Sequence, residues 1–193
     1  PPLTWFETIL LAMSAAFFVF SSLATLTPET ILTASDAVRQ HLPLAREIWQ
    51  QQAILVFPFV DPGSASLLGA SLNAVAFGLG GFTALGVLQS LVSLSCLVAI
   101  AGLGSTLAGR LAGIVAASIF SAMPLVLWLS GHAYPDLLAV LFACVAAQCA
   151  ISWQIDGRRS WLILAGLLAG FSLATKQISA VVVVALVSGL VIA

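Results

Sequence analysis

Uncharged apolar runs recur along this chain, and they constrain its fold more than any motif does. A run of about 20 such residues forms a helix long enough to cross ~30 Å of hydrocarbon. Hydrophobic residues make up 61% of the chain and charged residues 7%, too few to cover the surface of a soluble domain. The sequence therefore predicts an all-α polytopic membrane protein.

The apolar runs predict about six transmembrane helices in one membrane module that occupies residues 1–193. The first run is too long for a signal-peptide core and lacks a basic leader, so we interpret it as a retained anchor. Because the chain starts at Pro1 and stops inside an apolar run, we expect it to be part of a longer protein. The spans are expected at residues 3–26, 82–103, 111–129, 137–153, 161–175 and from 178 onward.

A long external loop with interfacial helices, residues 27–81, is expected after the first span. Six of the thirteen charged residues lie within residues 28–62, a density that lipid does not accommodate. One amphipathic helix is expected from Ser35 and Asp36, which can cap it, to Trp49, with a bend at Pro43. Its apolar face is expected to comprise Val38, Leu42, Ala45 and Trp49.

The segment of residues 64–81 decides which polar residues share a membrane face. It is short, contains Asn73 and four glycines, and is therefore expected to be a second juxtamembrane helix. In that topology Asp36, His41, Asp136 and Lys176 converge on one face. If the segment spans instead, Asp136 and Lys176 lie opposite Asp36, and five arginines gather on one side, as the positive-inside rule favours.

Three charged residues beside the apolar runs are candidates for a site, because charge near membrane depth is costly and needs a reason. Asp36 and Asp136 are either helix caps or carboxylates with a chemical role. Lys176 either extends its ammonium to the interface or binds an anion. His41 and His132 are weaker candidates as metal ligands beside the aspartates, since their spacing matches no tight site.

Several classes of partner find no support in the sequence. A net charge of −1, with Arg158-Arg159 as the one basic pair, gives no argument for a nucleic-acid partner. The three cysteines all lie in apolar runs and predict neither a disulfide framework nor a metal site.

Three motifs resemble GT-C-type, polyprenyl-phosphate-dependent glycosyltransferases. Residues 35–49, Ser-Asp-Ala-Val-Arg-Gln-His-Leu-Pro-Leu-Ala-Arg-Glu-Ile-Trp, resemble that family's first external loop, in which an acid precedes a His-Leu-Pro-Leu-Ala stretch. Residues 133–137, Ala-Tyr-Pro-Asp-Leu, resemble its second acidic turn, and residues 161–176 resemble its Gly-rich helix that closes in Thr-Lys. Relatives include protein mannosyltransferases and the aminoarabinose transferases that modify lipid A.

The resemblance implies a site and a reaction. Asp36 would be the general base on the acceptor, Asp136 a supporting carboxylate, and Lys176 a contact for the donor phosphate, with His41 and Tyr134 as further substrate-binding residues. The reaction would move a sugar from a polyprenyl-phosphate donor to a hydroxyl of a lipid, glycan or protein acceptor. The expected location is a bacterial inner membrane, with the first loop on the outer side.

A divalent metal ion held by Asp36 and Asp136 is a hypothesis that the same resemblance raises. Many relatives carry a second acid where Ala37 follows Asp36 here, which puts metal dependence in question. The alternative to an enzyme is a non-catalytic structural subunit of a larger membrane protein complex. Half of a transporter is a weaker alternative, because no internal repeat is evident.

Overall fold

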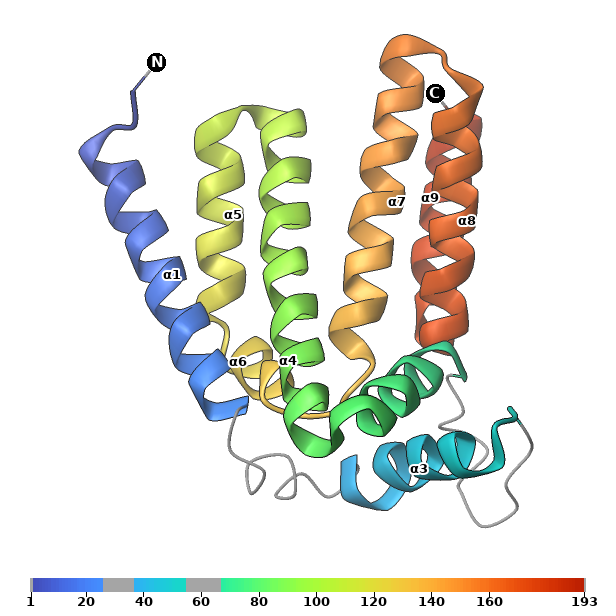
Figure 1. The fold of residues 1–193 in the computed structure, drawn as a ribbon. Helices are drawn as coiled ribbons and strands as arrows, with labels where there is room; N and C mark the ends of the chain where they lie inside the picture. The colour runs from blue at the N-terminus through green and yellow to red at the C-terminus, as the bar shows by residue number, and fades with distance from the viewer. Residues whose placement is uncertain (1, 26–36, 55–66, 193) are drawn as a thin grey trace.

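A computed structural model of the chain describes residues 2–25, 37–54 and 67–192 (Figure 1). Within these ranges every element is a helix. In chain order they are α1 (Trp5–Thr25), the π-helical turn η1 (Ala37–His41), α3 (Leu42–Gln51), α4 (Leu67–Ala108), α5 (Arg110–Ala122), α6 (Pro124–Ser130), α7 (Asp136–Asp156), α8 (Arg159–Thr175), the 3-10 turn η3 (Gln177–Ser179) and α9 (Ala180–Ile192).

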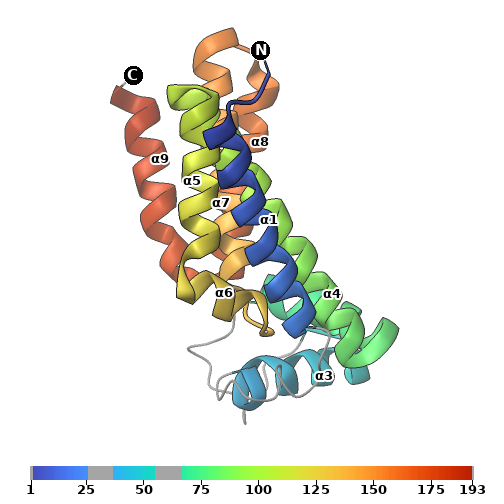
Figure 2. The ribbon, with the colours of Figure 1, turned by 90° about the vertical axis from the view of Figure 1, so that its left-hand side faces the viewer.

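The long helices lie side by side, and the short ones gather at one end of the bundle. Figures 1 and 2 show α1, the second part of α4, α5, α7, α8 and α9 with their axes roughly parallel, running alternately toward and away from one end. In both views α3 and α6 lie at the same end, which we call the α3 end. This arrangement brings the C-terminal ends of α1, α6 and α8 to the same end of the bundle.

The helices have the length and composition of membrane spans, and the protein is an integral membrane protein. Among the described residues, three helices are long and apolar enough to cross a membrane, α1, α4 and α7, or four if the bent pair of α5 and α6 counts as one span. Side chains such as Phe20, Ile163 and Val184 are exposed along the helices, as lipid contact allows. With 17 residues, α8 rises only ~26 Å. The count of six spans stays a prediction.

A glycine pair bends α4 sharply. Gly81 has a φ of 62°, a left-handed conformation that only glycine adopts without strain, and Gly80 is also non-helical. Residues 67–79, which we call the platform, therefore lie across the α3 end, whereas the rest of α4 runs along the bundle (Figure 1). The platform covers most of the segment expected as a juxtamembrane helix and is continuous with the next long helix; its place at the membrane surface stays a prediction.

The loop helix α3 packs on the platform with a different face from the one expected. Leu44, Ala45 and Ile48 are buried against Ala70 and Ala74. The predicted face was partly wrong, since its members Val38 and Trp49 are more than a third exposed. The π-helical turn explains Val38, because its wider turn breaks the 3.6-residue phase before α3. Trp49 lies within α3, at the edge of the face that Leu44, Ala45 and Ile48 bury.

The span expected at residues 111–129 is broken. The helix axis bends by 71° between α5 and α6. Met123 takes an extended conformation before Pro124, because the proline ring disfavours helical geometry in the preceding residue and Pro124 has no N–H to continue the helix. As a result α6 lies across the α3 end and leads into the turn that precedes α7.

An ion pair joins α1 to α5 at the end opposite α3. Arg110 binds Glu7 with two contacts, Nε to Oε1 at 2.9 Å and Nη2 to Oε2 at 3.0 Å. Glu7 also accepts a hydrogen bond from the backbone N–H of Thr4, whose hydroxyl caps the N–H of Glu7. This reciprocal capping box fixes the start of α1.

Candidate active site at the α3 end

The residues between α6 and α7 form a short acidic turn, residues 131–136, at the α3 end. Asp136 is the first residue of α7, and its carboxylate accepts a hydrogen bond from the ammonium of Lys176. Both side chains are partly buried, with exposed fractions of 26% for Asp136 and 40% for Lys176. The acid lies at a helix N-terminus and the lysine directly follows a helix C-terminus, where the peptide dipoles stabilise each charge.

A chain of aromatic rings connects the acidic turn to the loop helices. The ring of Tyr134 contacts His41 edge-on, with centroids 5.4 Å apart, and faces His132 at 6.3 Å. His132 lies against Trp128 at 3.9 Å, and its Nδ1 is 2.6 Å from the Trp128 carbonyl oxygen. Since a carbonyl only accepts, Nδ1 carries the proton and donates. Tyr134 thus links α6 and α7 to the turn that precedes α3.

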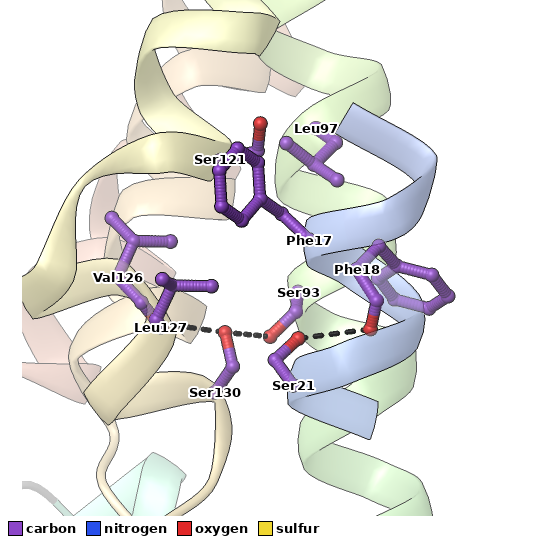
Figure 3. A pocket seen from close by; sticks show the side chains of 9 residues that line it. All are labelled: Phe17, Phe18, Ser21, Ser93, Leu97, Ser121, Val126, Leu127 and Ser130. Atoms are coloured by element: carbon purple, nitrogen blue, oxygen red, sulfur yellow. Dashed lines mark hydrogen bonds between the residues drawn. The ribbon is translucent and has the colours of Figure 1, made fainter. Parts of the chain in front are cut away.

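Hydrogen bonds from α4 hold the acidic turn at its middle and at the residues on either side of it. Ser93 donates to Ser130, the last residue of α6, at 2.9 Å (Figure 3). Asn73 donates to the Ala133 carbonyl at 3.4 Å. Cys96 donates to the Leu137 carbonyl at 3.0 Å. The backbone that carries Asp136 is therefore tied to one helix at three points.

The platform also contacts the residues next to both charges. Gly69 lies so close to the turn that an added Cβ would be 2.6 Å from Pro135 Cβ and 3.6 Å from Thr175 Cγ2. Pro135 precedes Asp136, and Thr175 precedes Lys176. Because residue 69 is a glycine, the platform can approach Pro135 and Thr175, the residues that precede Asp136 and Lys176.

The cavities near this end differ greatly in size. The cavity among four serines in Figure 3, between α1, α4, α5 and α6, measures about 10 Å³, which is room for a single water at most. A groove beside α3 measures about 420 Å³, within the range of ligand sites. It combines apolar side chains such as Phe77 and Phe82 with polar ones that include Arg46. The groove, and not the serine cavity, has the size to admit a substrate.

The structure brings four of the five predicted site residues to the α3 end. A ring contact joins His41 to Tyr134, and an ion pair joins Asp136 to Lys176. Asp36 lies outside the described residues, and so does the expected cap of the loop helix. The roles assigned to these residues stay predictions, because proximity does not test chemistry.

The described residues do not fit a metal ion. Within residues 2–25, 37–54 and 67–192, no three His, Cys, Asp or Glu side chains gather closely enough to hold one. Asp136 is paired with a cation, which opposes a second positive charge beside it. The hypothesis of a metal ion between Asp36 and Asp136 stays a prediction, because Asp36 lies outside the described residues.

Sequence reasoning missed the residues that hold the site. Gln89 was not singled out, and Asn73 and Gly69 were noted only as features of a short segment. The sequence could have identified Gln89, because it places an amide in an uncharged apolar run, where burial without a partner is costly.

The model of a known protein family matches residues 66–193, about two thirds of the chain. That family is described as dolichyl-phosphate-mannose-protein mannosyltransferase. The chain belongs to this mannosyltransferase family. The resemblance to GT-C glycosyltransferases is thereby confirmed. The acidic turn and Lys176 lie inside the matched region of the mannosyltransferase family, whereas Asp36 and α3 lie before it. No curated protein and no solved structure matches the chain.

Proposed function

We propose that this chain is the membrane module of a glycosyltransferase that moves a sugar from a polyprenyl-phosphate donor to an acceptor hydroxyl. Membership of the mannosyltransferase family supports a membrane glycosyltransferase of the GT-C type. The observation that carries the proposal is the ion pair of Asp136 and Lys176 at the α3 end, the end where a groove of ligand size also lies along α3. The long prenyl tail of the donor would stay in hydrocarbon while its sugar phosphate reaches these polar residues.

The reaction assigns one role to each charge. The acceptor oxygen forms a bond to the anomeric carbon as the bond from that carbon to the phosphate oxygen breaks. The acceptor proton passes to the carboxylate of Asp36. The departing polyprenyl phosphate gains negative charge, which the ammonium of Lys176 offsets. Asp136 holds Lys176 in place until the donor phosphate competes for it.

The membrane arrangement is part of the proposal. We place the α3 end on the outer side of a bacterial inner membrane, with six helices crossing the bilayer: α1, the second part of α4, α5 with α6, α7, α8 and α9. Single cysteines at positions 36 and 136, in a background without Cys96, Cys144 and Cys149, should both react with an impermeant reagent added outside. Labelling from opposite sides would contradict the shared site.

Donor titration of the full-length protein tests the role of Lys176. Lys176→Gln removes the charge and should weaken donor binding, whereas Lys176→Arg should retain part of it because the charge survives. Arg159→Gln is the matched control, since it removes an exposed cation at the opposite end of the bundle. An unchanged donor Kd for Lys176→Gln would remove this lysine from the site. Absence of transfer by the wild-type protein would favour the non-catalytic subunit.

A further inference from the structure

We propose that Asn73 and Gln89 are positioning residues that keep α4 bent and hold the acidic turn in place. Neither side chain is among those assigned to the reaction, and their hydrogen bonds go to Ala133 and to each other. They act through the Ala133 carbonyl and the platform. The effect on transfer rests on the proposed function, whereas the effect on structure does not.

The two amides form a directed pair. Gln89 Nε2 donates to Asn73 Oδ1 at 3.2 Å, and Asn73 Nδ2 donates to the Ala133 carbonyl oxygen at 3.4 Å. The carbonyl can only accept, so Asn73 must present its NH₂ to Ala133. That leaves the Asn73 oxygen for Gln89, which must present its own NH₂. The orientation of both amides therefore follows from one backbone carbonyl.

The pair exists only because α4 is bent. Asn73 and Gln89 are 16 residues apart in one helix, which in a straight α-helix would separate them by ~24 Å. The bend at Gly80 and Gly81 folds the platform back so that the two side chains meet. Each residue is 4% exposed, and a buried amide without a partner is unfavourable. Satisfying both amides therefore favours this bend over a straight helix.

The bend in turn sets the position of the charged pair. The platform carries Gly69, which contacts Pro135 and Thr175, the neighbours of Asp136 and Lys176. It also carries Asn73, which holds Ala133, a fully buried residue of the turn. Loosening the bend would release these contacts together. The amide pair therefore stabilises the relative placement of the two charges from a distance.

Hydrogen exchange of the acidic turn tests the structural part directly. In the full-length protein, Asn73→Ala should speed exchange of the backbone N–H groups of residues 131–136, because the turn loses its central contact. Gln89→Met removes the second amide while keeping a flexible side chain of similar size, and should have a smaller effect in the same direction. The double variant should exchange like Asn73→Ala, since the two residues act as a unit. Ser14→Ala, which removes a contact between α1 and α5, should leave the turn unchanged.

Kinetics test the functional part. Both variants should lower the transfer rate, for Asn73→Ala on the order of 10²-fold, as expected for misplacement of ~1 Å. The donor Kd should change less than kcat, because the charge of Lys176 is retained. Wild-type exchange in the turn of Asn73→Ala or of Gln89→Met would overturn the proposal, and so would fully additive effects. If wild-type protein transfers no sugar, the proposed function fails, yet the exchange result still decides this inference.

Discussion

Replacement of Gly69 by alanine is the sharpest test of how the platform supports the site. The new Cβ would lie 2.6 Å from Pro135 Cβ, whereas carbon atoms in contact prefer about 3.5–4.0 Å. The platform and the acidic turn must therefore separate by ~1 Å. Overpacking of this kind costs about 1–3 kcal/mol of stability. A shift of ~1 Å at the neighbouring Asp136 should lower the transfer rate on the order of 10²-fold.

The assay compares thermal unfolding and sugar transfer of the purified full-length variants. Gly166→Ala, in the long helix α8, is the matched control, because nothing lies within 4 Å of its added Cβ. It should be as stable as the wild type or slightly more so, since alanine favours helix over glycine. If Gly69→Ala unfolds and transfers like Gly166→Ala, the close approach of the platform to Pro135 has no role in the site.

Three further predictions address other parts of the molecule. Asp36→Asn should lower transfer by ~10²–10⁴-fold while the protein remains folded in the membrane, because the amide keeps the size of the side chain but removes the base; a near wild-type rate would reduce Asp36 to a helix cap. Gly78→Ala, which places a Cβ against the ring of Trp49, should speed hydrogen exchange of α3, and Trp49→Leu in the same background should reverse this. Arg110→Gln should lower the unfolding temperature by leaving the buried carboxylate of Glu7 without its cation, and the double variant with Glu7→Gln should recover part of the loss; no recovery would contradict an electrostatic role.

The sequence predicted an all-helical membrane protein correctly, but it did not predict where the chain changes direction. The start of α7 at Asp136 and the end of α8 at Thr175 follow from the edges of apolar runs, where a charge leaves the hydrocarbon. The bend before Pro124 was missed because hydropathy sums over residues and ignores the direction of the axis. Val38 was wrongly assigned to the buried face because a π-helical turn shifts its phase relative to α3.

The sequence by itself determined the class of protein and which charged residues are candidates for a site. Uncharged runs of membrane length permit only helices here, since every backbone group in lipid must find its partner within the segment. Asp136 and Lys176 were recognisable because charge at membrane depth is costly. These inferences depend on composition and on neighbours in the chain.

Only the tertiary structure decided how the site is held. Residues 67–108 form one helix that Gly80 and Gly81 bend, and the bend lays its first part across the α3 end as the platform. The pairing of Asn73 with Gln89, and of Asp136 with Lys176 from another helix, depends on where that bend and the helix ends come to lie. Contacts between residues distant in the chain follow from the packing of whole helices, which no local pattern encodes.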